Sequence, residues 1–100
     1  MTEREQFDAS EVRALLYRRQ RGYCATCRLP LDPTHYHAAH RIPQRKHWLK
    51  RYGKEVIHHP ENLRATCPTE ACNGAVSLGN NEVLCDELAR YIQTLMEDER

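Results

Sequence analysis

The stretch "HYHAAHRIPQ", residues 35–44, places three histidines close together and a proline shortly after the last of them. Turn-forming residues precede it at Pro30, Asp32 and Pro33. We therefore expect a β-strand of about five residues that ends near His40. Histidines in such an arrangement can bind a metal ion, take part in catalysis or lie on the surface, and the surrounding sequence has to distinguish these roles.

Four of the five cysteines form two closely spaced pairs, one on either side of this stretch. Cys24 and Cys27 are spaced C-x2-C, Cys67 and Cys72 are spaced C-x4-C, and Cys85 is left over. An odd number of cysteines, after an N-terminus without the apolar core of a signal peptide, argues against a disulfide framework. Two such pairs can complete a tetrahedral zinc site, and four buried thiols without a ligand are the alternative. The spacing predicts a structural zinc site with four cysteine ligands, which would stabilise a small domain.

The length of one hundred residues favours a single domain. Apolar residues at helical spacing predict an N-terminal helix over residues 8–21 and a C-terminal helix over residues 80–97. Between these helices, residues 22–79 contain the cysteine pairs and the strand, and residues 55–66 are expected to form a loop that leads into a second short strand. The expected fold class is α+β.

The insert at residues 41–54 is basic and contains no acidic residue. A helical turn over residues 44–52 would place its cations side by side, where they would contact DNA phosphates without reading the base sequence. A solvated helix face is the alternative interpretation of such a charge run. The residues expected to bind DNA are Arg41, Arg45, Lys46, Lys50, Arg51 and Lys54.

Taken in order, the segments "CATC", "AHRIPQ", "HPENLRATC" and "CNGAV" resemble the HNH nuclease family in its zinc-stapled form. The chain is similar to a subgroup of small phage and bacterial HNH proteins that share the Ala-His start, and the resemblance covers roughly residues 12–78. The resemblance implies a ββα-metal fold, in which a hairpin and a helix surround one catalytic divalent ion. It also implies hydrolysis of DNA phosphodiester bonds.

The resemblance assigns roles to three residues. The general-base histidine of the family falls on His40, its middle asparagine on Asn62, and its last metal-binding position on Asn73. Neutral imidazole suits a base near pH 7, and Asn62 would hold His40 or the facing strand through amide hydrogen bonds. A plain turn residue after Pro60 is the alternative role of Asn62. Asn73 can offer a carbonyl oxygen to Mg²⁺, Mn²⁺ or another divalent ion, which would stabilise charge in the transition state.

One position departs from the family pattern. Most members carry an Asp, Glu or His immediately before the base, whereas this chain has Ala39, which offers no ligand atom. His37 shares a strand face with Ala39 and lies roughly 7 Å from it along the strand. His59, three residues before Asn62, and its neighbour His58 are the other candidates. The second metal ligand is therefore expected to be His59 or His37, unless the site holds no metal without DNA.

The leading expectation is a metal-dependent HNH endonuclease with a separate structural zinc. A catalytically weak or inactive zinc-stapled module that binds nucleic acid is the alternative, and an adaptor acting through the acidic C-terminal helix is a third. We expect DNA as the partner, a cytoplasmic location in a bacterial or phage-infected cell, and a homodimer if the C-terminal helix self-associates. No membrane association is expected, because the chain lacks a run of about 18 apolar residues.

Overall fold

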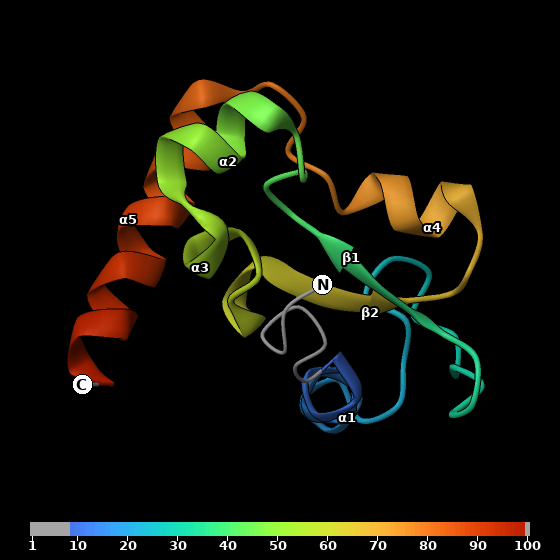
Figure 1. The fold of residues 1–100 in the computed structure, drawn as a ribbon. Helices are drawn as coiled ribbons and strands as arrows, with labels where there is room; N and C mark the ends of the chain where they lie inside the picture. The colour runs from blue at the N-terminus through green and yellow to red at the C-terminus, as the bar shows by residue number, and fades with distance from the viewer. Residues whose placement is uncertain (1–8, 100) are drawn as a thin grey trace.

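The structure is a computed structural model that describes residues 9–99 (Figure 1). Helices and one two-stranded sheet confirm the expected α+β class. In chain order the elements are α1 (Ala9–Arg19), β1 (His37–His40), α2 (Lys46–Tyr52), α3 (Lys54–Ile57), the 3₁₀ helix η1 (Pro60–Asn62), β2 (Leu63–Thr66), α4 (Glu70–Ala75) and α5 (Glu82–Asp98).

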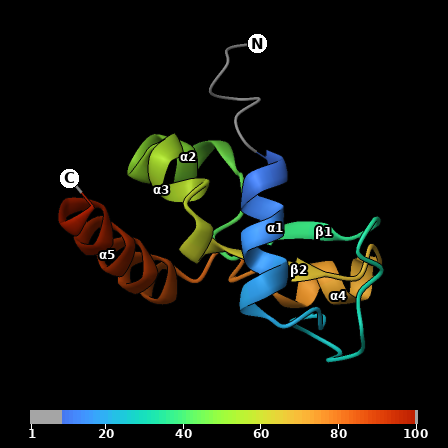
Figure 2. The same cartoon turned by 90° about the horizontal axis from the view of Figure 1, so that it is seen from below.

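The two strands pair in antiparallel register, with His37 opposite Thr66 and His40 opposite Leu63. Because side chains alternate along a strand, His37 and Ala39 lie on one face of the sheet and His40 lies on the other. Figures 1 and 2 show α4 and α1 on opposite sides of this sheet. The sheet therefore separates the His37 face, which α4 covers, from the His40 face, on which α1 packs.

Two apolar clusters hold the described residues together. The first lies between α2, α3 and α5 and is centred on Trp48, which is 1% exposed. The second joins α1 to β1, β2 and the cysteine segments, and its largest apolar side chains are Leu16, Leu31, Tyr36 and Leu63. The fifth cysteine, Cys85, is fully buried in the first cluster and lies apart from the other four.

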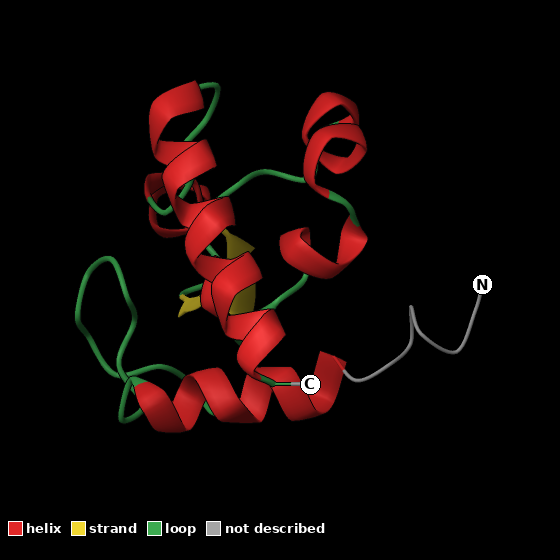
Figure 3. Cartoon of the chain, turned by 90° about the vertical axis from the view of Figure 1, so that its left-hand side faces the viewer, coloured by secondary structure: helices red, strands yellow, loops and turns green. Residues whose placement is uncertain are grey.

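Helix α5 forms because its apolar residues recur at helical spacing and because Asn81 caps its first turn. The Asn81 side chain accepts a hydrogen bond from the backbone N–H of Leu84. Figure 3 shows α5 as the long helix that ends at C, on the side of the molecule away from α4 in Figure 1. Among residues 9–99, no helix is long and apolar enough to cross a membrane.

The sequence predictions place the elements closely, with one error. The predicted N-terminal helix corresponds to α1, and its first predicted residue, 8, lies outside the described residues. The prediction that residues 55–66 form a loop leading into a second short strand is confirmed for the strand, which is β2, and wrong for the loop, because α3 and η1 precede that strand. The physical reason is burial: Val56 and Ile57, 3% and 0% exposed, pack into the first cluster. Their packing stabilises a helical turn that is too short to show a periodic pattern.

Candidate active site and zinc centre

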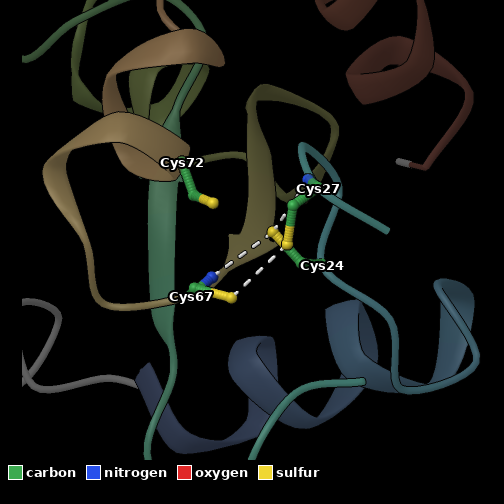
Figure 4. A group of neighbouring side chains, drawn as sticks. All are labelled: Cys24, Cys27, Cys67 and Cys72. Atoms are coloured by element: carbon green, nitrogen blue, oxygen red, sulfur yellow. Dashed lines mark hydrogen bonds between the residues drawn. The ribbon is translucent and has the colours of Figure 1, made fainter. Parts of the chain in front are cut away.

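The four cysteines of the two predicted pairs come together at one end of the sheet (Figure 4). Their sulfur atoms all lie within 4.8 Å of one another, and the Sγ atoms of Cys27 and Cys67 are 3.7 Å apart. Zn–S bonds of about 2.3 Å in a tetrahedron require sulfurs about 3.8 Å apart. The cluster therefore fits one zinc ion, and it is the one group of three or more such ligands found among residues 9–99.

Backbone N–H groups stabilise the thiolate form of one cysteine in this cluster, Cys24. The Sγ of Cys24 accepts hydrogen bonds from the N–H groups of Thr26, Cys27 and Cys67. Burial raises the pKa of Cys24, but these donors outweigh burial and lower the pKa to about 6. The neighbouring Cys27 thiol raises the pKa of Cys67 to about 12. Four thiolates therefore need a compensating cation in order to coexist here, and a dication supplies that charge.

The cluster ties three distant segments together. The N–H of Ala25 donates to the carbonyl of Ala65 in β2 at 3.0 Å. The hydroxyl of Thr26 donates to the carbonyl of Cys72 in α4 at 2.8 Å. Thr69 caps α4 by accepting the N–H of Cys72 at 3.3 Å. The cysteines thus fasten the segment after α1 to the end of β2 and the start of α4.

His40 lies at the end of β1 and lines a groove on the face opposite α4. Its Nε2 is 3.2 Å from Nδ1 of His58, and its Nδ1 is 3.3 Å from Nε2 of Gln44. Burial, and then the nearby His58, lower the pKa of His40 to about 4. The imidazole is therefore neutral at pH 7, and this neutral form is the one that can accept a proton.

Asn62 is fully buried and joins two segments through its amide. Its Oδ1 accepts the N–H of Ile42 at 2.8 Å, and its Nδ2 donates to the carbonyls of Ile42 and Ile57. Ile42 follows His40 by two residues, and Ile57 directly precedes His58. Asn62 therefore holds the backbone on both sides of the His40–His58 pair and does not touch His40 itself in these contacts.

Asn73 and His37 meet on the other face of the sheet. The Nδ2 of Asn73 is 3.0 Å from Nδ1 of His37, and the Thr66 hydroxyl is 3.4 Å from the Asn73 Oδ1. Ala39 lies on the same strand face and is 7% exposed, so no ligand atom comes from the position where the HNH pattern expects one. Among the candidate metal ligands, His37 is therefore the histidine that contacts Asn73.

The other two histidines considered as ligands have different partners. The Nδ1 of His59 accepts the N–H of Glu61 and caps η1, and its Nε2 is 3.3 Å from a carboxylate oxygen of Glu99. His58 pairs with His40, and burial and the charge of Lys54 lower the pKa of His58. Both rings are thus engaged away from Asn73, which favours His37 over His59 as the companion of Asn73.

The groove at His40 has a volume of about 1040 Å³ and runs between α1, β1, α3 and the end of α5. Apolar side chains form much of its wall, among them Val12, Leu49, Leu63 and Met96. His40, His58 and His59 line it, together with Gln44, and so does the exposed His37 at the start of β1. The groove therefore reaches from His40 to the edge of the sheet at His37. The neutral imidazole of His40 therefore faces a concave and partly apolar space, which is a common environment for a reacting group.

The six basic residues of the insert differ in their surroundings: two guanidiniums bind side chains at or near α5, and the other four range from half-buried to exposed. Arg45 donates to the Asn80 side chain at 2.6 Å, and Arg51 pairs with Asp86 at 3.3 Å and lies over the Trp48 ring. Arg51 therefore links α2 to α5, and Arg45 links the residue before α2 to the loop before α5. The other four are Arg41, which is half-buried, and the exposed Lys46, Lys50 and Lys54.

Sequence reasoning missed the partners of His40. It gives Gln44 no role beyond its place in the motif, and it considers His58 as a metal ligand and not as a neighbour of the base. The adjacent histidines at positions 58 and 59 are the available signal, but the short helix α3 that directs His58 toward His40 has no pattern in the sequence.

Comparisons with protein-family models, with curated proteins and with solved structures find no match to this chain.

Proposed function

We propose that this chain is a metal-dependent HNH endonuclease that hydrolyses DNA phosphodiester bonds, with a separate structural zinc held by the four cysteines. The observation that carries the proposal is that one strand, β1, supplies both the candidate base, His40, and a candidate metal ligand, His37. Its end presents the neutral His40 to a groove, and its start brings His37 within 3.0 Å of Asn73 on the helix that follows β2. The order strand, antiparallel strand, helix is the order that the motif resemblance implies.

In this proposal His40 is the general base. Its neutral ring takes a proton from the attacking water, and Asn62 keeps the two backbone segments that carry His40 and His58 at a fixed separation. A pKa of about 4 makes a weak base. A phosphate anion bound beside the ring would raise the pKa of His40, because a nearby negative charge favours the protonated imidazolium.

The catalytic ion would be held by His37 and Asn73. The Asn73 atom that faces His37 is Nδ2, so the amide would have to turn to present its Oδ1 beside the His37 nitrogen. An imidazole nitrogen and an amide oxygen are then acceptable donors for Mn²⁺ or another transition ion, and a hard ion such as Mg²⁺ usually completes its shell with water and substrate phosphate. When bound, the ion would supply Lewis-acid stabilisation of the transferred phosphoryl group. With only two side chains to hold it, we expect weak binding of the ion before DNA is present.

Phosphate contacts are proposed for the cations that project from the insert. Lys46 and Lys50 are exposed on α2, and Arg41 follows His40 directly. Such contacts position DNA without specifying sequence. The guanidiniums of Arg45 and Arg51 are engaged with α5 and its preceding residue, so their contribution to DNA binding is expected to be smaller.

The test is a plasmid-nicking assay on the zinc-loaded 100-residue chain with Mg²⁺, Mn²⁺ or Ni²⁺. We expect wild type to nick DNA and His40→Ala to lose about 100-fold or more of the rate, the order that a general base contributes. His35→Ala is the matched control, since His35 is exposed and lies outside the groove. Equal cleavage by His40→Ala would show that His40 is not the base.

The second candidate function is a zinc-stapled module that binds nucleic acid without cleaving it. Ala39 is the observation that favours it, because the position before the base provides no metal ligand. Absence of nicking with every metal, together with DNA binding that weakens steeply with salt, would select this second function over the first.

A further inference from the structure

Both ring nitrogens of His40 have a side-chain neighbour, and the two neighbours differ in chemistry. The amide nitrogen of Gln44 lies 3.3 Å from Nδ1, and the Nδ1 of His58 lies 3.2 Å from Nε2. The two imidazole rings meet edge to face, with centroids 5.2 Å apart and planes at 74°. The facing nitrogens of the two rings are therefore within hydrogen-bond distance, and one of them must carry the proton.

The two contacts together select one tautomer. An amide NH₂ group can only donate, so the Nδ1 of His40 accepts and carries no proton. A neutral imidazole then carries its proton on Nε2, and that N–H donates to the Nδ1 of His58. His58 in turn carries its own proton on Nε2, because its Nδ1 is the acceptor.

His58 is held in place for this contact. Its backbone N–H donates to the Lys54 carbonyl at 2.9 Å, at the end of α3. The preceding carbonyl, that of Ile57, accepts the Asn62 amide at 2.8 Å. The same amide group binds both backbone polar groups of Ile42, two residues after His40. One buried asparagine thus fixes the distance between the segments that carry the two histidines.

We propose that His58 is a positioning residue, which accepts the Nε2–H of His40 and so keeps the Nδ1 lone pair of His40 turned toward Gln44, at the place where a water is activated. The catalytic part of this inference rests on the proposed endonuclease function, and the tautomer does not. Gln44 is exposed and lines the same groove, so its side chain can move aside for a water at Nδ1.

The test reads the tautomer directly in the zinc-loaded 100-residue chain. Protein labelled with ¹⁵N-histidine is measured at neutral pH by long-range ¹H–¹⁵N correlation, which separates protonated from unprotonated ring nitrogens. We expect wild-type His40 to be protonated on Nε2 and His58 to be unprotonated on Nδ1. A wild-type His40 protonated on Nδ1 would overturn the proposal, and this measurement requires no variant to fold.

Two variants then separate positioning from packing. His58→Asn retains an acceptor oxygen close to the position of Nδ1, and His58→Ala removes it. Because Gln44 still faces Nδ1 in every variant, the variants report the hydrogen bond and not the tautomer. We expect the hydrogen-bonded Nε2–H signal of His40 to persist in His58→Asn and to be lost in His58→Ala, with His35→Ala unchanged. An unaltered His40 spectrum in His58→Ala would contradict the proposal.

The kinetic readout adds a prediction specific to the enzyme. Loss of one positioning hydrogen bond should lower kcat about tenfold in His58→Ala with little change in KM, and His58→Asn should restore most of it. An equal loss of kcat in both variants would show that packing, and not the hydrogen bond, is responsible. If wild type cleaves no DNA, the endonuclease proposal fails while the spectra still decide the tautomer.

Discussion

At the scale of single residues, burial has direct consequences for the polar side chains of Asn62 and His40. Asn62 is fully buried and directs its amide hydrogen bonds at backbone groups, so its polar atoms are satisfied. His40 is half-buried beside a second histidine, so its charged form is disfavoured. Each leads to a quantitative expectation.

Replacement of Asn62 by Ala should leave three buried backbone groups without partners. We expect the free energy of unfolding to fall by about 3–5 kcal/mol, since each unsatisfied buried group costs about 1–3 kcal/mol. Urea unfolding of the zinc-loaded chain measures it. Asn80→Ala is the control, because Asn80 is exposed and accepts one bond from Arg45. A loss below about 1 kcal/mol for Asn62→Ala would mean that Asn62 is an ordinary turn residue.

The depressed pKa of His40 should appear as a pH dependence of stability. The unfolded chain binds a proton at this residue near pH 6.5, whereas the folded chain does so near pH 4. Between these values the unfolded state holds more protons, so folded-state stability falls as the pH is lowered. From pH 7 to pH 5 we expect wild type to lose about 2 kcal/mol more than His40→Gln.

Urea unfolding of both chains at the two pH values measures this difference. The acid sensitivity of the cysteine cluster is common to wild type and His40→Gln, so it cancels in the comparison. His35→Gln, at an exposed position, should follow wild type. Parallel losses in wild type and His40→Gln would mean that the folded protein does not depress the pKa of His40.

At the scale of elements, the short helix α4 connects the two candidate metal-binding features. It carries Cys72 of the cysteine cluster, and its next residue, Asn73, reaches His37 on β1. A helix of six residues has little stability of its own, so its cap and the cysteine must hold it in place. The position of Asn73 therefore depends on Thr69 and on the cysteine cluster.

Thr69→Ala should weaken this helix by about 1 kcal/mol, the usual cost of removing a cap. We expect a lower melting temperature and a lower zinc affinity in chelator competition, since Cys72 would be less well placed. Thr69→Ser keeps a capping hydroxyl and should behave like wild type. If Thr69→Ala and Thr69→Ser are equally affected, the methyl group and not the cap is what matters.

The elements show which parts of the structure can be predicted from the sequence. The C-x2-C and C-x4-C pairs predict a cluster because each spacing is a local turn that points two sulfurs the same way. The helix ending at Asp98 is predictable because seventeen residues give enough periods to recognise. Helix α3 is not predictable, because four residues show no period and their packing against α5 is set by tertiary contacts.

The candidate site follows the same rule. Motif order points to His40, Asn62 and Asn73, and a pairing of Asn73 with His37 is one of several alternatives that the sequence leaves open. The pairing of His40 with His58 depends on how α3 is oriented, and the role of Asn62 depends on two backbone segments that are distant in sequence, at Ile42 and Ile57. Such contacts between distant segments leave no spacing signature in the sequence.

At the scale of the whole molecule, the described residues form two apolar clusters, and the one built on α1 and the strands contains the four-cysteine cluster. Cys24 and Cys72 belong to the second apolar cluster, so a bound metal and packing would support the same half of the fold. Without a bound cation the four thiols cannot all ionise together at neutral pH, as the raised pKa of Cys67 indicates. Zinc ligation should therefore supply a large part of the folding free energy.

Removal of zinc by a strong chelator should unfold the chain cooperatively, with loss of helical circular dichroism, and added zinc should refold it. Cys27→Ser tests the assignment, because Cys27 is exposed and its replacement costs little packing. We expect this variant to show the circular dichroism of chelated wild type, and chelator to change it no further. Cys85→Ala should still bind one zinc, since Cys85 lies in the other cluster. A chelated wild type with unchanged melting would show that the four cysteines act as buried thiols, and the fold would then rest on its apolar clusters alone.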